Sequence, residues 1–485
     1  MRKNYLLLCF LISTFLFSAR GDLISVELLG TRSVNNNQFY VDDELSAISG
    51  QFALNPVTYG YWLYKVTYET INKDGEVHIA TGSVAYPRVD WPEEPNESFP
   101  LISYQHGTVL ERSSVTSENG IWILAAYLAG SGYVYVEPDY LGLGDSEGMH
   151  PYQIKEPYGT CVVDLLRAVK QYSLENYQFE VNDQLFLVGY SEGGYATMAA
   201  HQIIERDYDE EFNITASFPM AGAYSMSEIM VDVMLGMEEY GEPFYFPYVL
   251  FAYGDSYPEI GPITDYLLPE YHELENMFDG YTSSTYVNEF MPSIPAMIMY
   301  PDSITSFQEN YNHPLKVALR ENDLWNWTPE SPMYIFHGLA DELVPASNAD
   351  LAYNQFIENG ATEVYLEYIP TSFGGHQDAA PWALLGAFEF AQQLAVVNCL
   401  VDVDCLGECG GSAIIDDCGA CNGDNSSCGV VGDLNQDSIV NILDVVSLIN
   451  TVLAWEYNSA GDMNNDGSND IVDIVQLINL ILSAS

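Results

Sequence analysis

Ser191 lies in the segment that most constrains this chain, the run Gly-Tyr-Ser-Glu-Gly-Gly at residues 189–194. The apolar residues 185–188 before it predict a strand, and residues 195–201 after it predict a helix. A serine on so tight a strand-to-helix turn needs small neighbours, because the backbone is strained and strand and helix nearly touch. The segment therefore predicts a nucleophile elbow, in which the helix N-terminus directs free N–H groups at an oxyanion beside Ser191.

A serine nucleophile needs a base within hydrogen-bond reach and an acid that orients the base. In the fold that carries this elbow, the order along the chain is Ser, then Asp or Glu, then His. The predicted strand 332–336 leads into a turn that contains Asp341, and His376 is the only histidine beyond that turn. We therefore predict Ser191, Asp341 and His376 as the catalytic residues. Two alternative acids do not directly follow a strand: Asp350 and Asp378.

The oxyanion formed during acyl transfer needs backbone N–H donors, one of which comes from the loop after an earlier strand. The predicted strand that starts at Pro100 ends in the sequence His-Gly-Thr at residues 106–108. We expect the N–H of Gly107 or Thr108 as one donor and the N–H of Glu192 as the second. His106 itself is expected to have a structural role.

The N-terminus carries Arg2 and Lys3, an apolar stretch at 5–17 and small residues near Gly21. This pattern predicts a secretory signal peptide over residues 1–21. The apolar stretch is too short to span a bilayer. We therefore expect the mature protein to be secreted or held at the cell surface.

The chain is strongly acidic, with 69 Asp and Glu residues against 14 Lys and Arg residues and a formal net charge of -55. A surface of this sign repels phosphate backbones. We therefore expect no nucleic-acid partner.

A cluster of cysteines interrupts the chain at residues 398–429, where apolar periodicity almost disappears. Its members are Cys399, Cys405, Cys409, Cys418, Cys421 and Cys428. In a secreted chain an even cluster predicts disulfides, whose connectivity the sequence does not give. A zinc site is the alternative, since Cys418 and Cys421 have ligand spacing. Cys161 is left over and is expected to be a buried thiol.

The last segment contains two copies of one loop, and the second copy begins at Asp462, 29 residues after Asp433. In each copy oxygen-bearing side chains stand at loop positions one, three, five, nine and twelve, the spacing by which an EF-hand-type loop wraps Ca²⁺. The candidate ligands are Asp433, Asn435, Asp437, Asn441 and Asp444 in the first copy and Asp462, Asn464, Asp466, Asp470 and Asp473 in the second. Each loop leads into an apolar helix, predicted at 442–453 and 471–481.

Residues from about 59 to 391 resemble an α/β-hydrolase of the secretory lipase family. The resemblance rests on the segments 104–108, 139–144, 150–152 and 189–194 and on those that carry Asp341 and His376. It implies an ester hydrolase that needs no cofactor for catalysis and has a helical cap inserted late in the sheet, at about 225–326. Aromatic and Met residues in this cap either line an acyl pocket or form the cap's own core.

Residues 430–485 resemble a dockerin, a calcium-binding module for attachment or assembly. The resemblance implies structural Ca²⁺ on the ten loop positions named above and a cohesin-like or cell-surface partner. Two features depart from the family pattern. Ser438 replaces the usual glycine at the sixth loop position, so the first loop is expected to bind more weakly. The partner-reading positions are apolar here: Ile442, Leu443, Ile471 and Val472.

The predicted architecture is an α/β-hydrolase fold with a helical cap, a small Cys-rich segment and an EF-hand-like all-α dockerin-type module. The segments are a signal peptide at 1–21, the catalytic domain at 22–397, a Cys-rich linker at 398–429 and the dockerin-like domain at 430–485. The predicted function is that of a secreted lipase or carboxylesterase acting on an acyl ester of a lipid or of a polysaccharide. The alternatives are a serine peptidase of the same fold and a non-catalytic surface or scaffold protein.

Overall fold

The computed structural model describes residues 20–45, 55–89, 95–119, 123–176, 178–415, 421–422 and 430–484. Contacts divide the chain into two compact units, Met1–Asn398 and Cys399–Ser485. Most of the predicted signal peptide lies outside the described residues. Of its last two positions, Arg20 donates to the Asp164 carboxylate at 3.2 Å and Gly21 donates its N–H to the carbonyl of Glu69. No helix among the described residues is long and apolar enough to cross a bilayer.

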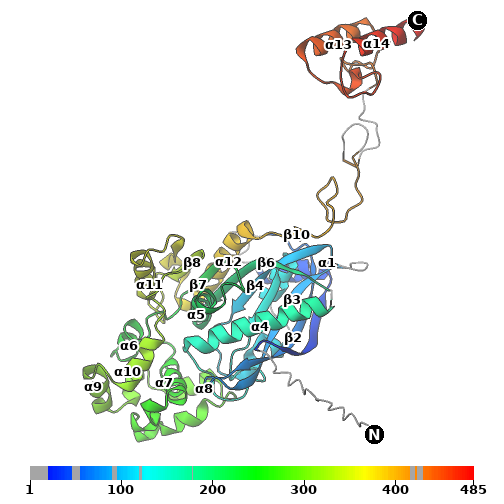
Figure 1. Ribbon diagram of the computed structural model, residues 1–485. Coiled ribbons are helices and arrows are strands. Elements are labelled where there is room, and N and C mark those ends of the chain that lie inside the picture. Colours follow the sequence, from blue (N-terminus) through cyan, green and yellow to red (C-terminus); the bar gives the residue numbers. More distant parts are fainter. Residues whose placement is uncertain are drawn as a thin grey trace, which may run out of the picture. The chain divides into compact units, whose positions relative to one another are not determined.

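A single mixed sheet forms the centre of the first unit, and its strands follow the order β1-β2-β3-β5-β4-β6-β7-β8-β9 (Figure 1). The strands are β1 (Leu23–Arg32), β2 (Gly60–Ile71), β3 (Val77–Arg88), β4 (Glu97–Gln105), β5 (Val134–Pro138), β6 (Val181–Tyr190), β7 (Ile214–Met220), β8 (Met333–Gly338) and β9 (Val364–Ile369). β1, β2 and β3 pair antiparallel, and β3 also runs antiparallel to β5. From β5 to β9 every pair is parallel. The carboxyl ends of these strands therefore meet at one edge, where α/β folds place their sites.

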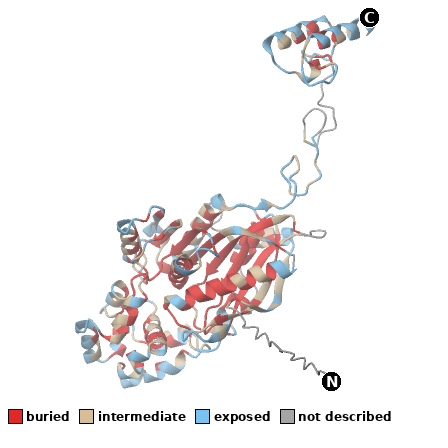
Figure 2. Cartoon of the chain, in the orientation of Figure 1, coloured by how far each residue is buried: buried red, intermediate tan, exposed pale blue. Residues whose placement is uncertain are grey.

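Helices cover both faces of the sheet, and they are α1 (Val34–Leu45), α2 (Thr116–Asn119), α3 (Ile123–Gly130), α4 (Lys155–Asn176), α5 (Glu192–Asp207), α11 (Ser347–Glu358) and α12 (His376–Leu394). Successive strand residues point to opposite faces. Leu185 and Leu187 of β6 accordingly pack into the core under α4 and α5, whereas Phe186 and Val188 pack into the core under α3 and α12. Figure 2 shows the strands and the inner side of α4 buried.

Between β7 and β8 the chain forms a separate group of helices, which confirms the predicted cap insertion (Figure 1). These helices are α6 (Ile229–Met234), α7 (Tyr245–Ser256), α8 (Ser284–Phe290), α9 (Pro301–Glu309) and α10 (Pro314–Glu321). Their buried aromatic and Met side chains join one cluster with Tyr140, Tyr158 and Tyr195 of the hydrolase body. The cap is thus packed onto the body as one continuous core.

The short strand β10 (Asn398–Cys399) spans the boundary between the two units, and the second unit continues through a loop that contains disulfides. Cys399 pairs with Cys409, and Cys405 pairs with Cys421. These pairs confirm the disulfide expectation and remove Cys421 as a zinc ligand, while residues 418 and 428 lie outside the described residues. As expected, Cys161 in the first unit is a buried free thiol.

The two apolar helices predicted at the end of the chain are α13 (Ile442–Ala454) and α14 (Ile471–Ala484). They pack on one another through a small core that contains Val445, Leu448, Ile474 and Leu477. Asn441 caps α13 by a capping box with Asp444, which fixes the start of the helix.

Candidate active site

The backbone of Ser191 has φ 63° and ψ −122°, a strained conformation for a residue with a side chain. Such strain costs about 1–3 kcal/mol and persists only where the surroundings impose it. The neighbouring glycines show the cause: a Cβ on Gly189 would collide with the carbonyl of Gly193, and a Cβ on Gly193 would collide with the carbonyl of Gln105. β6, α5 and the end of β4 therefore approach one another so closely that only glycine fits at positions 189 and 193.

His376 lies between the other two predicted site residues. Its Nε2 atom is 2.8 Å from Oγ of Ser191, and its Nδ1 atom is 2.6 Å from Oδ2 of Asp341. The side chains of His376 and Asp341 are almost completely buried. The three residues come from the elbow after β6, the turn after β8 and the first position of α12. The structure thus brings together three residues that are far apart in the sequence.

Several contacts fix the position of His376. Its backbone N–H donates to Oε2 of Glu342 at 3.0 Å, and its carbonyl accepts from the hydroxyl of Tyr190 at 2.6 Å. Oδ1 of Asp341 accepts from the backbone N–H groups of Leu343 and Val344. These hydrogen bonds anchor both the acid and the base.

Asp341 has a second imidazole neighbour that the sequence argument missed. Nε2 of His337 lies 3.5 Å from Oδ2 of Asp341 and 2.8 Å from the carbonyl of Val344. Burial alone would raise the pKa of the Asp341 carboxyl, but hydrogen bonds from His337 and His376 outweigh burial and lower it to about 2. The carboxylate is therefore charged at every pH at which the protein would act.

The predicted oxyanion donors lie around the elbow. α5 begins at Glu192, so the N–H of Glu192 is one of the first N–H groups of the helix, which have no partner within it. A Cβ on Gly107 would lie 3.5 Å from the carbonyl of Tyr190, which places the loop after β4 beside β6. The Oγ1 atom of Thr108 is 3.0 Å from the hydroxyl of Tyr152. His106 is buried, with Nδ1 2.8 Å from the carbonyl of Gly107, as expected of a structural residue.

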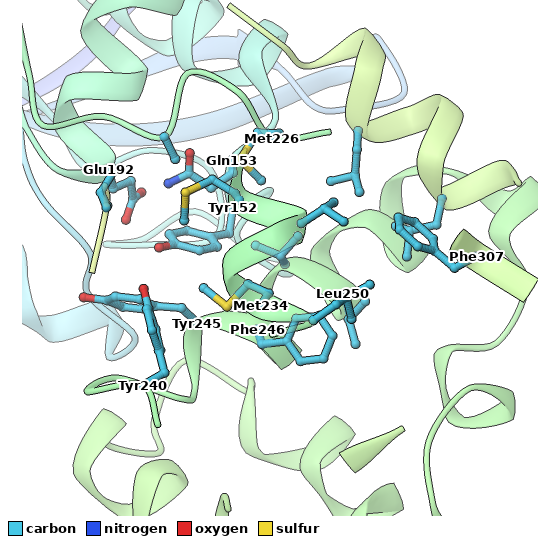
Figure 3. Close-up of a pocket in the computed structure, with 18 of the residues that line it drawn as sticks. Tyr152, Gln153, Glu192, Met226, Met234, Tyr240, Tyr245, Phe246, Leu250 and Phe307 are labelled. Atoms are coloured by element: carbon cyan, nitrogen blue, oxygen red, sulfur yellow. The ribbon is translucent and has the colours of Figure 1, made fainter. Parts of the chain in front are cut away.

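A pocket opens beside Ser191 and runs under the cap (Figure 3), with about 820 Å³ of empty space, part of it open to solvent. Polar side chains lie at the end near Glu192, including the hydroxyls of Tyr240 and Tyr245. Leu250 and Phe307 lie at the other end (Figure 3). Aromatic and Met side chains of the cap thus line the pocket, and many of them also belong to the core.

The side chain of Glu192 belongs to the site as well, whereas the sequence argument used only its backbone. Its Oε1 atom lies 2.9 Å from Nε2 of His150 and 2.8 Å from the hydroxyl of Tyr158. The glutamate is next to the nucleophile in sequence, but its partners are 42 and 34 residues away. Two features of the sequence point to this cluster: the position of Glu192 beside Ser191, and the segment 150–152.

The two acidic loops of the second unit fold alike. In the first loop Oδ1 and Oδ2 of Asp433 accept from the N–H groups of Asp437 and Ser438. The equivalent oxygens of Asp462 accept from Asp466 and Gly467.

The last acidic position of each loop also closes the loop by hydrogen bonds. Asp444 accepts from the N–H groups of Leu434 and Asn441, and Asp473 accepts from those of Met463 and Asp470. Among the described residues no three His, Cys, Asp or Glu side chains converge closely enough to form a metal cluster. The loops nevertheless present only oxygen donors, which is the chemistry that Ca²⁺ prefers.

Comparisons with known proteins identify two families along the chain. Residues 105–385 match the family described as secretory lipase, and residues 431–482 match the dockerin type I domain. A crystal structure of the rice cell wall degrading esterase LipA from Xanthomonas oryzae is 25% identical, with a TM-score of 0.67, and the match covers 77% of this chain and 98% of that one. No curated protein matches the sequence.

Two further solved structures are similar. A putative hydrolase from Legionella pneumophila is 27% identical, with a TM-score of 0.67, over 77% of this chain and 98% of that one. Candida antarctica lipase A in its closed state, at 16% identity and a TM-score of 0.57 over 78% of this chain and 82% of that one, shares the fold. The chain therefore belongs to the secretory lipase family and carries a dockerin type I domain at its C-terminal end.

Proposed function

We propose that this protein is an extracellular serine ester hydrolase with Ser191, His376 and Asp341 as its catalytic triad. The observation that carries the proposal is the position of His376, 2.8 Å from the Ser191 hydroxyl and 2.6 Å from the Asp341 carboxylate, while Ser191 lines an apolar pocket. Membership of the secretory lipase family supports an ester as the substrate. Residues 1–21 are proposed to direct export.

The reaction follows from this geometry. Oγ of Ser191 attacks the ester carbonyl while Nε2 of His376 takes the hydroxyl proton, and N–H groups of Glu192 and of Gly107 or Thr108 stabilise the oxyanion. His376 then gives the proton to the departing alcohol, which leaves an acyl-serine. A water molecule, deprotonated by His376, hydrolyses this ester and releases the acid. The Asp341 carboxylate holds the imidazole in one tautomer and stabilises its protonated form.

We infer the placement of the two halves of the substrate from the polarity of the pocket. The interior under the cap is apolar at its far end, so we assign it to the acyl group. The alcohol lies toward solvent and is either part of a lipid or linked to a polysaccharide. The esterase from Xanthomonas oryzae is described as degrading the rice cell wall, which supports the second source.

The dockerin domain is proposed to bind two Ca²⁺ ions and to attach the enzyme to a cohesin-like or cell-surface partner. In the first loop the ligands would be Asp433, Asn435, Asp437, Asn441 and Asp444, and in the second Asp462, Asn464, Asp466, Asp470 and Asp473. A bound cation would neutralise carboxylates that otherwise repel one another. The apolar residues Ile442 and Ile471 are 64% and 68% exposed at the starts of α13 and α14, where a partner can contact them.

A chain-length series of p-nitrophenyl esters, measured with the wild type and with Ser191→Ala, tests the proposed reaction. We expect the wild type to hydrolyse the esters and the variant to lose several orders of magnitude in kcat while it keeps its circular dichroism spectrum. A matched peptide amide distinguishes an esterase from a peptidase. Near-normal ester hydrolysis by Ser191→Ala would exclude the triad.

A further inference from the structure

Two buried acceptor atoms on the pocket wall have no hydrogen-bond partner among the described residues, namely Oε2 of Glu192 and Oε1 of Gln153. Both residues line the same pocket as Ser191, and they are only 2% and 4% exposed. Figure 3 places them together near one end of the pocket, away from Phe307. Buried polar atoms are nearly always paired, so two unpaired acceptors in one cavity are positions at which a bound molecule can supply the donors.

The hydrogen bonds around Glu192 show whether its unpaired oxygen acts as a donor or as an acceptor. Nδ1 of His150 is 2.8 Å from the carbonyl of Leu141, and a carbonyl only accepts, so Nδ1 carries a proton. Nε2 then faces both Oε1 of Glu192 at 2.9 Å and the hydroxyl of Tyr158 at 3.1 Å. These contacts engage Oε1 and leave Oε2 as an acceptor without a donor among the described residues.

The partners of Glu192 in this cluster are one imidazole and one phenol, both of which contact Oε1. Tyr158 adds only a neutral hydroxyl, which donates to Oε1 of Glu192 at 2.8 Å. The lining of the pocket is mostly apolar, so a neutral donor such as a hydroxyl is less costly to bury beside Oε2 than an ammonium group.

Gln153 is held with its carbonyl oxygen free. Its backbone has φ 59°, its N–H donates to the hydroxyl of Tyr158, and its carbonyl accepts from the hydroxyl of Tyr253 at 2.8 Å. Oε1 of its side-chain amide is buried and has no donor among the described residues. A strained backbone that is held on both sides is a feature of ligand-binding positions.

We propose that Glu192 Oε2 and Gln153 Oε1 accept hydrogen bonds from a hydroxyl group of the substrate, so that the enzyme selects hydroxylated esters. The inference deepens the proposed function and rests on it, because it assumes that an ester binds with its carbonyl at Ser191. The hydroxyl is carried either by the acyl chain, close to the ester carbonyl, or by the alcohol. A hydrogen-bonding site discriminates strongly against a substrate without the hydroxyl, because its buried acceptors are then left unpaired.

Two matched substrate pairs test this specificity. For the acyl chain the pair is p-nitrophenyl 3-hydroxybutyrate and p-nitrophenyl butyrate, and for the alcohol it is glycerol monobutyrate and propyl butyrate. We expect the hydroxylated member of one pair to have a roughly 10- to 100-fold higher kcat/KM in the wild type. The pair that shows the preference identifies the half of the substrate that carries the hydroxyl.

Two nearly isosteric variants remove the acceptors without emptying the pocket. Glu192→Gln places an NH₂ group where Oε2 lies, and Gln153→Met removes the amide oxygen. Either variant should bring the ratio of kcat/KM values to within about threefold of one, because the hydroxylated ester should lose more rate than its unsubstituted partner. Met234→Leu, on the same pocket wall but without a polar atom, is the control and should change both members of a pair equally.

The outcomes separate this inference from the proposed function. A wild type that hydrolyses both pairs without a preference overturns the inference and leaves the triad intact. A preference that survives in both Glu192→Gln and Gln153→Met also overturns it. If Glu192→Gln does not fold, Gln153→Met alone decides. Ser191→Ala with wild-type rates on the unsubstituted esters overturns the proposed function and this inference together.

Discussion

Oδ2 of Asp341 lies 2.6 Å from Nδ1 of His376, while Oδ1 of the same carboxylate is held by two backbone N–H groups. Because the carboxylate is fixed, its replacement by an amide would keep the position but reverse the hydrogen bond to Nδ1. The imidazole would then be trapped in the tautomer that has no free Nε2 lone pair for Ser191. We expect Asp341→Asn to lower kcat by about 10³- to 10⁴-fold. Measurement with p-nitrophenyl butyrate checks this, and a loss below tenfold in a folded variant would contradict the role of Asp341.

The pH profile of ester hydrolysis should show one acid limb. The pKa of Asp341, lowered to about 2 by its two histidine partners against the effect of burial, keeps this carboxylate ionised across the assay range. Activity therefore falls at acid pH only when His376 takes up a proton and can no longer accept one from Ser191. The logarithm of kcat/KM plotted against pH should have a limiting slope of about one. A slope of two, or a flat profile into the acid range, would contradict this assignment.

The apolar pocket under the cap should set the acyl length. Leu250 lies at the far end from Glu192, so Leu250→Trp would shorten the space available to the chain (Figure 3). We expect the kcat/KM for p-nitrophenyl dodecanoate, divided by that for p-nitrophenyl butyrate, to fall at least tenfold. Leu174→Trp, at a position of α4 that is 72% exposed, is the surface control. An unchanged ratio in Leu250→Trp would place the acyl chain elsewhere.

Two buried carboxyl groups should make the folded protein less stable as pH rises. Burial raises the pKa of Glu137 to about 7 and that of Asp139 to about 6, although hydrogen bonds from neighbouring hydroxyls oppose the shift. An acid whose pKa is higher in the folded state than in the unfolded one binds its proton more tightly there. Its contribution to the free energy of unfolding is therefore fully present below about pH 4 and is lost as pH rises through about 7. Thermal unfolding at pH 5 and pH 8 measures this loss, which should be smaller in Glu137→Gln; an equal loss in the variant would exclude Glu137 as the cause.

The elements with strong local signals were predictable from the sequence. The strand before Ser191, the helix after it and the two calcium-type loops each depend on residues close together in the chain, and the order Ser, Asp, His restricted the remaining choice. The antiparallel strands β1 to β3 were not assigned. β3 is buried along most of its length, so its residues do not alternate between apolar and polar. The contacts of His337 with Asp341 and of His150 with Glu192 arise only when strands and loops meet, which no local pattern encodes.

Ser438 in the first acidic loop has φ 67°, at the position where the second loop has Gly467 with φ 83°. A side chain in this left-handed region costs about 1 kcal/mol, because its Cβ approaches the following carbonyl. The first loop should therefore bind Ca²⁺ more weakly than the second, and Ser438→Gly should tighten it by roughly fivefold.

Calorimetry of the isolated segment 430–485 with Ca²⁺ measures both sites, and circular dichroism should show helix gained on binding, because the metal-free carboxylates repel one another. Gly467→Ser is the matched control and should weaken the second site by a similar factor. The first unit has its own core, so a chain ending at Asn398 should keep its esterase activity. Equal affinities in the wild-type loops would show that loop conformation does not set the affinity. No Ca²⁺ binding at all would contradict the proposed calcium sites.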